Sequence, residues 1–338
     1  MGEPGDPTST SATVPGMTRW GILATGHIAA TFVEDLRLLP DAEVVAVGSR
    51  SLATAHTFAG RHGIPRAYGS WQELAADADI DVVYVATPHA AHYDAAMTCL
   101  SAGRAVLCEK PITLDRAGGK ELVDTARCRS VFLMEAMWMR CNPVVLRILE
   151  LIGDDAIGEV TAVQADFGVA GPFPPEHRMR ARTLGGGALL DLGVYPISLA
   201  HLLLGVPDQV RAWAKLGPEG VDENTGIIFG YDSGAVAALT CGIVGATPVA
   251  ATITGSTGRI ELSPPFYRPS QVTLHRAAAE PEIVPADLTG SGYQHEAAEV
   301  QRCLRAGLAE SPLVPHAATL DVMGLLDTVR EQIGVSYP

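Results

Sequence analysis

The 338-residue sequence predicts an α/β protein in two parts, a doubly wound parallel sheet followed by an α+β domain with a mostly antiparallel sheet. Two observations predict this fold class. In residues 17–143, short runs that are apolar throughout alternate with helical patterns, as in a parallel sheet covered on both faces. In residues 144–338, strand patterns follow one another through short turns, as in antiparallel sheets. Residues 1–16 are rich in Gly, Pro, Ser and Thr and are predicted to be a disordered tail.

The elements follow from the apolar pattern. In the first part the predicted strands are 20–23, 44–47, 82–86, 105–108 and 131–134, and the helices are 28–38, 52–61, 93–101 and 116–127. In the second part the predicted strands are 160–167, 210–215, 226–231, 236–241, 250–254, 258–262 and 272–275, and the helices are 188–204, 293–306 and 317–333. Residues 236–239 and 250–253 are apolar over consecutive positions, which indicates burial on both faces of their strands.

Composition argues against several classes of partner. A net charge of -14, a pI near 5.1 and the absence of a dense Lys/Arg run argue against nucleic acid and anionic membranes. We find no stretch that is long and apolar enough to span a membrane, and residues 1–16 lack the pattern of a secretory signal. The six cysteines include no C-x-x-C pair and are expected to be buried, reduced thiols rather than disulfides or metal ligands. We therefore expect a cytoplasmic protein that binds no metal.

The turn between the first strand and the first helix has the spacing of a dinucleotide fingerprint of the G-x-G-x-x-G/A type. Ala24, Gly26, His27 and Ile28 would form the phosphate-binding turn, and Ala29 would let the helix pack closely on the strand. Ala24 occupies the place of the first glycine, so we expect a negative φ there. The strand before the turn and the helix after it predict a Rossmann dinucleotide-binding domain, whereas an ordinary βα turn is the alternative.

The end of the second strand bears on the choice of cofactor. An NAD site usually places Asp or Glu there for the ribose 2′-hydroxyl, but this chain has Ser49 and Arg50, which suit a 2′-phosphate. We therefore expect NADP(H) in preference to NAD(H), and a solvated surface role for Arg50 is the alternative. Thr87 and Pro88, after the third strand, would border the nicotinamide, and His92 would contact substrate or cap a helix.

Three side chains form the predicted reaction site. Lys110 follows the fourth strand, at the sheet edge where open α/β sheets bind ligands. Asp191 and Tyr195 are four residues apart and share one face of a helix that follows three glycines. A nearby ammonium should lower the pKa of the phenol, so Tyr195 could exchange a proton with a substrate hydroxyl while hydride moves to or from a nicotinamide. Alternatively, Tyr195 is only a packed helix residue.

Taken together, these motifs resemble the Gfo/Idh/MocA oxidoreductases over nearly all of the chain after the tail. Many members of that family have histidine where this chain has Tyr195. A tyrosine there resembles the branch with dimeric dihydrodiol dehydrogenases, NADP-dependent xylose dehydrogenases and some nucleotide-sugar ketoreductases. The likeness rests on the turn 21–29, Thr87-Pro88, Glu109-Lys110-Pro111, residues 135–143, and the glycines 185–187 with Asp191 and Tyr195.

The resemblance implies roles for individual residues. Lys110 and Tyr195 would be the catalytic pair, Glu109 would position Lys110 beside the cofactor, and Asp191 would bind substrate. The substrate pocket would be lined by His92, Trp138, Arg140, Arg178, Asp191 and Tyr195. The resemblance also implies that the second sheet is open and that its exposed face forms a homodimer or a dimer of dimers.

The expected function is NADP(H)-dependent hydride transfer to or from a hydroxyl or keto carbon of a sugar, a nucleotide-sugar, or a cyclic diol or polyol. One alternative is a non-redox enzyme that keeps its cofactor tightly bound for transient oxidation. Another is a non-catalytic NADP-binding partner protein. The set of Lys110, Asp191 and Tyr195 argues against that last alternative, because sensing NADP needs no proton donor.

Overall fold

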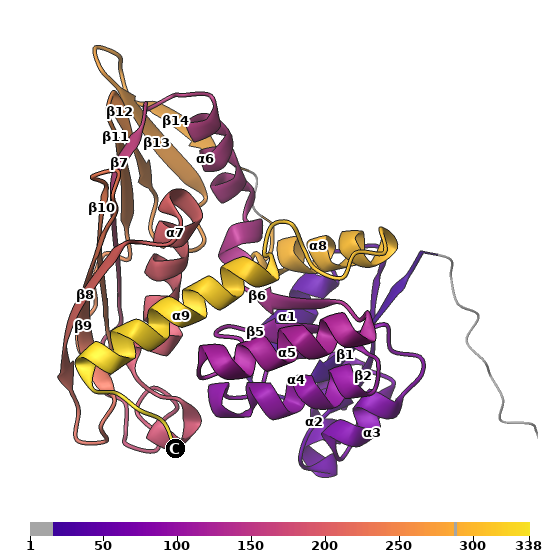
Figure 1. Cartoon of the computed structure of the whole chain (residues 1–338). Helices are drawn as coiled ribbons and strands as arrows, with labels where there is room; N and C mark the ends of the chain where they lie inside the picture. Colours follow the sequence, from indigo (N-terminus) through magenta and orange to yellow (C-terminus); the bar gives the residue numbers. More distant parts are fainter. Residues whose placement is uncertain (1–15, 287–288) are drawn as a thin grey trace, which may run out of the picture.

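The protein folds into two domains that lie beside each other, one built on each predicted sheet (Figure 1). The structure, a computed structural model, describes residues 16–286 and 289–338. The predicted disordered tail, residues 1–16, lies outside the described residues except for Gly16. Helix α9 (His316–Ile333), yellow in Figure 1, runs between the two domains.

The first domain contains a six-stranded parallel sheet in the order β3-β2-β1-β4-β5-β6. The order reverses between β1 and β4, so the ligand-binding edge of this fold lies at the carboxyl ends of these two strands. The predicted doubly wound parallel sheet is confirmed. Its strands are β1 (Thr18–Leu23), β2 (Ala42–Gly48), β3 (Arg66–Tyr68), β4 (Val82–Val85), β5 (Ala105–Glu109) and β6 (Leu133–Ala136).

Most helices begin and end within two residues of their predicted limits. Ser51, Ser70 and Asp115 accept a backbone N–H at the starts of α2, α3 and α5, which explains where these helices begin. The sequence did not predict β3, α3 or α6. In β3 and α3, three and six residues are too few to show a period. The α-helices before α9 are α1 (His27–Leu36), α2 (Leu52–His62), α3 (Trp71–Ala76), α4 (His92–Ser101), α5 (Arg116–Arg129), α6 (Pro143–Gly153), α7 (Val194–Leu204) and α8 (Tyr293–Arg305).

The second domain contains an eight-stranded sheet in the order β14-β13-β12-β11-β7-β10-β9-β8. Neighbouring strands are antiparallel except β7 and β10, which run parallel, so the predicted mostly antiparallel sheet is confirmed. The sequence did not predict β14. The strands are β7 (Val160–Gly168), β8 (Gln209–Leu216), β9 (Asp222–Gly230), β10 (Val236–Gly242), β11 (Ala251–Gly255), β12 (Gly258–Leu262), β13 (Gln271–Arg276) and β14 (Glu282–Pro285).

The second sheet packs against helices on one face only (Figure 1). Helices α6, α7 and α9 contact that inner face. Leu239 and Ile253 point inward and are buried, whereas Val236 on the outer face is 43% exposed. The expectation that residues 236–239 and 250–253 are buried on both faces is therefore wrong for a single chain, because no described element covers the outer face.

Residues 182–204 form a long apolar segment that passes through the core. It consists of the 3₁₀ turn η3 (Arg182–Leu184), the π-helix η4 (Leu189–Gly193) and α7. Contrary to expectation, this segment is long and apolar enough to cross a membrane by length and composition, with a mean hydropathy of 1.5. However, 78% of its apolar window is buried inside the protein. A helix buried on all sides is apolar all round, which accounts for its composition.

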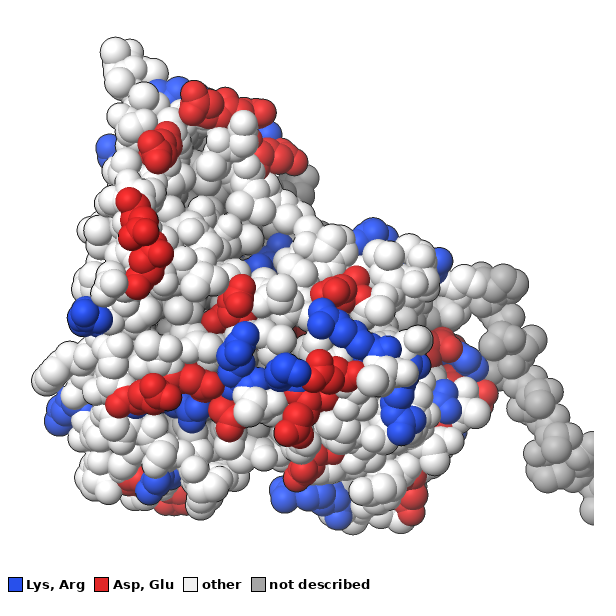
Figure 2. Space-filling model, in the orientation of Figure 1, with Lys and Arg blue, Asp and Glu red and all other residues white. Residues whose placement is uncertain are grey.

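Basic and acidic side chains are intermixed over the lower part of the face shown in Figure 2. Charged side chains of α5 also pair locally: Lys120 lies 2.5 Å from Asp124, and Arg127 lies 3.7 Å from Glu310. Exposed pairs of this kind contribute little to stability. Their effect here is to offset basic groups with neighbouring acids.

Five of the six cysteines are buried, as expected, and all six are free thiols. The expectation of burial is wrong for Cys128, which is exposed. Cys128 lies on α5, whose buried side is formed by Gly119, Leu122, Val123 and Ala126. The helical period therefore directs Cys128 away from the core.

Candidate active site

The turn after β1 leaves the first turn of α1 open to a ligand. Gly26 precedes α1 with φ -77° and ψ 179°, and no side chain caps the helix. A Cβ placed on Gly26 would meet no atom within 4 Å, and His27 is exposed. Unpaired N–H groups and the helix dipole at such an end favour a phosphate. The turn made by Ala24, Gly26, His27 and Ile28 therefore fits the pyrophosphate of a dinucleotide.

Ala24 has φ +129°, so the expectation of a negative φ at this residue is wrong. Its N–H donates to the carbonyl oxygen of Gly48 at the end of β2 (3.1 Å), which fixes the direction of the chain as it leaves β1. A residue with a Cβ has a steric cost in this region that glycine does not have. The turn thus keeps the backbone of a glycine turn although an alanine occupies it.

The other predicted cofactor residues also lie at the carboxyl ends of their strands. Ser49 and Arg50 directly follow β2, and Arg50 is exposed. Among the described residues, the Arg50 guanidinium forms no hydrogen bond or ion pair. Thr87 and Pro88 follow β4, and the buried Thr87 hydroxyl has no hydrogen-bond partner among the described residues. An unpaired buried hydroxyl and a solvated guanidinium fit a bound dinucleotide, which would complete their contacts.

His92 connects the loops that follow β4 and β5 and does not face a ligand. Its Nδ1 lies 2.8 Å from the Pro111 carbonyl oxygen and its Nε2 lies 2.8 Å from that of Thr87. The side chain is 1% exposed, and burial lowers its pKa to about 3 despite the two carbonyl contacts. The expected substrate contact and the alternative capping role are both wrong, because both ring nitrogens are committed to the two loops.

Lys110 forms a buried ion pair with Asp191 across the two domains. Its Nζ donates to Oδ1 of Asp191 and to the main-chain oxygen of the same residue, both at 2.8 Å. The two side chains are 11% and 8% exposed. Asp191 lies in the π-helix η4, and such turns occur often at functional sites. The structure therefore brings these two predicted site residues into direct contact.

Two more basic side chains contact the Asp191 carboxylate. Arg178 donates to Oδ2 (2.9 Å), and Nε2 of His89 lies 3.6 Å from Oδ1. Burial alone would raise the pKa of Asp191, but the Lys110 ammonium, His89 and Arg178 outweigh it and hold this pKa well below its ordinary value. Arg178 is 58% exposed, so one side of its guanidinium is open to solvent.

Tyr195 lies beside this ion pair, with Lys110 Nζ 4.9 Å from the centre of its ring. Its hydroxyl oxygen accepts a hydrogen bond from Nε1 of Trp138 (2.8 Å). The expectation of a lowered phenol pKa is wrong: burial raises the pKa of Tyr195 well above its ordinary value, and neighbouring Tyr293 and Glu109 add to the shift. The lysine does not reverse this shift, because its ammonium is bonded to Asp191.

Aromatic rings surround the Tyr195 phenol. Tyr267 and Phe167 lie 5.0 and 5.6 Å from its ring, and Tyr293 stacks on Trp138 at 4.2 Å and 9°. Only Trp138 was predicted from the sequence, because the others are single aromatic residues in separate parts of the chain. These rings make the side of the site next to the phenol apolar and flat.

Glu109 contacts the backbone of Lys110 rather than its ammonium. Its Oε2 accepts the Lys110 N–H (3.2 Å), and its Oε1 accepts the hydroxyl of Tyr84. Burial raises the pKa of Glu109, against the opposing charge of Lys110. The Glu109 carboxylate therefore fixes the backbone of Lys110, directly after β5.

Arg140 does not line the pocket, contrary to expectation. It is 5% exposed; its Nε donates to Ser198 Oγ (3.2 Å), and its Nη2 lies 3.0 Å from Nδ1 of His201. The residue lies in the turn η2 (Trp138–Cys141) and points at α7. Its guanidinium therefore joins η2 to α7 instead of reaching a ligand.

His89, which was not predicted as a site residue, lies between the two halves of the site. Its Nδ1 is 3.1 Å from the Gly185 carbonyl oxygen, and its Nε2 faces Asp191. The Thr87–His92 segment gave a signal, since it holds two histidines, but periodicity alone does not distinguish the one that faces the second domain. The geometry assigns that position to His89.

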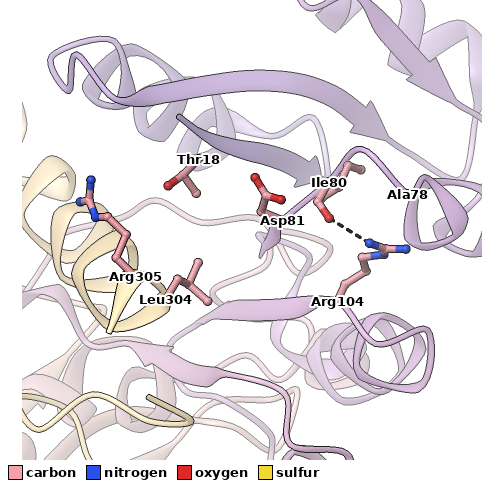
Figure 3. Close-up of a pocket in the computed structure, with 7 residues that line it drawn as sticks. All are labelled: Thr18, Ala78, Ile80, Asp81, Arg104, Leu304 and Arg305. Atoms are coloured by element: carbon pink, nitrogen blue, oxygen red, sulfur yellow. Dashed lines mark hydrogen bonds between the residues drawn. The ribbon is translucent and has the colours of Figure 1, made fainter. Parts of the chain in front are cut away.

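A separate hollow lies at the opposite edge of the first sheet (Figure 3). It has a volume of about 380 Å³, and Arg104 within it donates to the Ile80 carbonyl oxygen (3.0 Å). The hollow is at the amino ends of β1, β4 and β5, so it is not the cofactor site of this fold. Among the described residues, no group of three or more His, Cys, Asp or Glu side chains could hold a metal ion.

Comparison with known proteins agrees with this geometry. The model described as "Oxidoreductase family, NAD-binding Rossmann fold" matches residues 18–137, and the "GFO/IDH/MocA C-terminal domain" matches residues 145–261. The chain belongs to the Gfo/Idh/MocA oxidoreductase family. As a member of this family, it is an NAD(P)-dependent oxidoreductase, which confirms the expected class of enzyme.

Curated relatives and solved structures cover almost the whole chain. The trans-1,2-dihydrobenzene-1,2-diol dehydrogenase of Xenopus laevis is 39% identical over 330 residues, which are 95% of this chain and 99% of that protein. The structure of a 3-ketoreductase of Actinomadura kijaniata with NADP and TDP-benzene is 29% identical, has a TM-score of 0.83, and covers 94% of this chain and 98% of that chain. An aldose-aldose oxidoreductase of Caulobacter crescentus shares the Gfo/Idh/MocA fold with a TM-score of 0.85, at 21% identity over 94% of this chain and 97% of that one.

Proposed function

We propose that this protein uses NADP(H) to transfer hydride to or from a hydroxyl or keto carbon of a sugar, a nucleotide-sugar, or a cyclic diol or polyol. The observation that supports this best is the buried Lys110–Asp191 pair beside the Tyr195 phenol, at the sheet edge that binds dinucleotides. The nicotinamide, when bound, supplies or accepts the hydride at its C4. The chain supplies the proton and the orientation.

The proton step follows from the state of the phenol. Burial raises the pKa of Tyr195, so the hydroxyl is protonated at neutral pH and can donate its proton to the oxygen of a ketone that receives hydride. The phenolate left behind would be stabilised by the Lys110 ammonium and by the indole N–H of Trp138. It then recovers a proton from solvent. In the direction of oxidation, the same phenolate accepts the proton of the alcohol.

The walls of the site support a ring-shaped substrate with hydroxyl groups. Trp138 and Tyr293 present flat apolar surfaces, while Arg178 and Asp191 present polar groups nearby. One relative is named for a dihydrodiol, and a similar structure is that of a 3-ketoreductase with TDP-benzene bound. A dihydrodiol carries the hydroxyl carbon, and the substrate of a ketoreductase carries the keto carbon, that the proposal requires.

Two substitutions test the proton-transfer pair. Tyr195→Phe removes the proton donor, and Lys110→Met removes the charge that stabilises the phenolate. We expect each to lower kcat with NADPH and a ketone substrate about 10²–10⁴-fold. The matched controls are Tyr93→Phe and Lys120→Met, which alter a half-buried phenol bonded to Glu121 and an exposed ammonium bonded to Asp124, both outside the site.

Near wild-type kcat in both site variants would show that the pair is not catalytic. Cofactor that stays bound through purification without net turnover would instead favour a non-redox enzyme. Tight NADP(H) binding with no turnover across a broad panel of sugars and ketones would favour a non-catalytic partner protein.

The preference for NADP(H) is a separate proposal that depends on Arg50. Its guanidinium is exposed just after β2, where the 2′-phosphate of NADP would lie in this fold. We expect Arg50→Ala to raise KM for NADP(H) and to leave KM for NAD(H) nearly unchanged. Arg61→Ala on α2, also exposed, is the control. A clear preference of the wild type for NAD(H) would contradict the proposal.

We also propose a homodimer or a dimer of dimers through the outer face of the second sheet. Trp213, Ile228 and Val236 are 71%, 48% and 43% exposed on adjacent strands of that face. Ile228→Asp should shift the mass measured by light scattering to that of a monomer, and a monomeric wild type would refute the assembly.

A cytoplasmic location is proposed as well, on the ground that all six cysteines are free thiols.

A further inference from the structure

The segment that follows α9 is bonded to the loop that precedes Asp191. The Tyr337 hydroxyl donates to the carbonyl oxygen of Gly186 (2.7 Å), 151 residues earlier in the chain. The Arg182 guanidinium donates to the carbonyl oxygen (2.6 Å) and to the hydroxyl (2.7 Å) of Ser336. The segment 334–338 therefore holds one side of this loop through both main-chain and side-chain contacts.

The same loop supplies Arg178 and contacts His89, the two basic groups besides Lys110 that face Asp191. Arg178 donates to Oδ2 of the carboxylate (2.9 Å). The Gly185 carbonyl oxygen lies 3.1 Å from Nδ1 of His89, whose Nε2 lies 3.6 Å from Oδ1. Gly186, the residue bonded to the 334–338 segment, is adjacent to Gly185. A shift of the loop would therefore change how both basic groups face the carboxylate.

The glycine part of the loop is held by backbone hydrogen bonds, because residues 185–187 have no side chains. The N–H groups of the three glycines donate to the carbonyl oxygens of Arg182, Ala181 and Met179 (3.1, 3.1 and 2.9 Å). A Cβ at Gly185 would lie 2.7 Å from Leu114, and one at Gly186 would lie 2.9 Å from the Arg180 backbone, so the loop is pressed between its neighbours. Small residues allow that close approach. The hydrogen bond from Tyr337 adds a contact from outside the loop, at the Gly186 carbonyl oxygen.

Helix α9 fixes the segment relative to the first domain. Near its start, Thr319 Oγ1 donates to Glu135 (2.9 Å), and Nε2 of His316 lies 2.9 Å from the Leu133 carbonyl oxygen, both on β6. Further along, Asp327 accepts the Arg116 N–H (2.9 Å). The helix thus extends from the domain that carries Lys110 to the loop of the other domain (Figure 1).

We infer that Tyr337 is a positioning residue for the active site. Its bond to Gly186 keeps the 178–187 loop in the place where Arg178 and His89 face Asp191, and it thereby sets the affinity for substrate. The inference rests on the proposed function of this site. It predicts a dependence of substrate binding on the 334–338 segment, whereas the cofactor half of the site, at β1, β2 and β4, should be unaffected.

Tyr337→Phe tests the inference by removing one hydroxyl. We expect KM for substrate to rise about threefold to tenfold, roughly the equilibrium factor of one neutral hydrogen bond, with the Kd for NADP(H) unchanged. We expect kcat to change less than KM. The matched control is Tyr231→Phe, because the Tyr231 hydroxyl also donates to a glycine carbonyl, that of Gly205 (3.5 Å), away from the site.

Two further measurements separate positioning from a general loss of stability. In Tyr337→Phe/Arg178→Gln the rise in KM should be smaller than the product of the two single effects, because part of the effect of Tyr337 passes through Arg178. Fully multiplicative effects would overturn the inference. Hydrogen exchange at residues 184–187 should be faster in Tyr337→Phe than in Tyr231→Phe or the wild type.

The exchange measurement needs no turnover. An inactive wild type would therefore refute the proposed function while exchange still decides whether Tyr337 holds the loop. Unchanged exchange and unchanged KM in Tyr337→Phe would show that the 334–338 segment does not position the site.

Discussion

The two halves of the site are built from contacts of different range. The half in the first domain is local: His92 bonds to the carbonyl groups of Thr87 and Pro111, 5 and 19 residues away. Glu109 accepts the N–H of its neighbour Lys110. These contacts join the ends of two adjacent strands, so the order of the strands nearly suffices to form them.

The half in the second domain depends on distant partners. Asp191 is bonded to Lys110, 81 residues away, and Tyr195 to Trp138, 57 residues away. The Gly186 carbonyl is held from Tyr337, 151 residues away. The position of Lys110 on its strand therefore depends on the fold of the first domain alone. The positions of Asp191 and Tyr195 in the site depend on the packing of both domains.

Removing the charge of Asp191, which joins the two halves of the site, should have the largest effect on stability and activity. Asp191→Asn leaves the 11% exposed Lys110 without its counter-charge. We expect the free energy of unfolding to fall by about 3–5 kcal/mol and kcat to fall at least about 100-fold, because the ammonium loses its fixed place. Urea denaturation and steady-state kinetics measure the two effects. Asp124→Asn, in an exposed pair, should cost under about 1 kcal/mol, and a similar loss in both variants would remove the distinction.

Low pH should lower the free energy of unfolding through His92, which lies in the half of the site formed by the first domain. Because burial lowers the folded pKa to about 3, the unfolded chain binds this proton near its ordinary value of 6.5 while the folded chain does not. Stability is therefore full above pH 6.5 and is lost as the pH falls toward 3, by about 3 kcal/mol between pH 7 and pH 4. Urea midpoints of the wild type and His92→Gln across that range measure the effect.

The difference between the urea midpoints of the wild type and of His92→Gln, followed against pH, gives the contribution of His92 alone. Asp222, whose pKa burial raises to about 6, titrates in both proteins and cancels. The exposed His56→Gln should run parallel to the wild type. Parallel curves for His92→Gln as well would mean that His92 takes up its proton in the folded state.

A methyl group at Gly187 should disturb the half of the site that lies in the second domain. Gly187 has φ +114°, and a Cβ there would overlap Oδ1 of Asp222. We expect Gly187→Ala to cost about 2–3 kcal/mol and to raise KM for substrate more than Kd for NADP(H). Gly153→Ala, at a helical glycine with open space around it, should be neutral or slightly stabilising. Equal effects of the two changes would argue that the loop yields without strain.

The smallest effect should come from the cofactor turn. Ala24→Gly relieves the positive φ of +129° and should raise the free energy of unfolding by about 1 kcal/mol, with cofactor affinity kept. Ala29→Gly, within α1 and buried, should lower it by a similar amount. Thermal denaturation compares the two, and a destabilised Ala24→Gly would mean that the alanine side chain contributes packing that outweighs its strain.

Much of this architecture could be predicted from the sequence. Apolar runs and turns give both sheets, and strand ends place Lys110 and the phosphate turn at the same edge. The i, i+4 spacing correctly places Asp191 and Tyr195 together, near Lys110. These features depend on local periodicity, which a single sequence carries.

The predictions that were wrong concern side chains for which several nearby groups compete as partners. The pKa of Tyr195 is raised, not lowered, because burial of the phenol dominates and the lysine that was expected to act on it is bonded to Asp191. His92 and His89 have similar sequence surroundings, yet only His89 reaches the second domain. Spacing along the chain does not decide which of two nearby groups a charge will bind.

The contact between Trp138 and Tyr195 gives the protein an optical reporter at its centre. The indole donates to the phenol and stacks on Tyr293, so its emission should change with whatever reaches that phenol. Trp213 is 71% exposed and would dominate the solvent-sensitive signal, and Trp213→Phe would remove it. The other two tryptophans, the buried Trp20 and the half-buried Trp71, lie in the first domain and would add a background signal. Changes in the fluorescence of that variant could then follow events at the proton donor in real time, without a label and without a coupled assay.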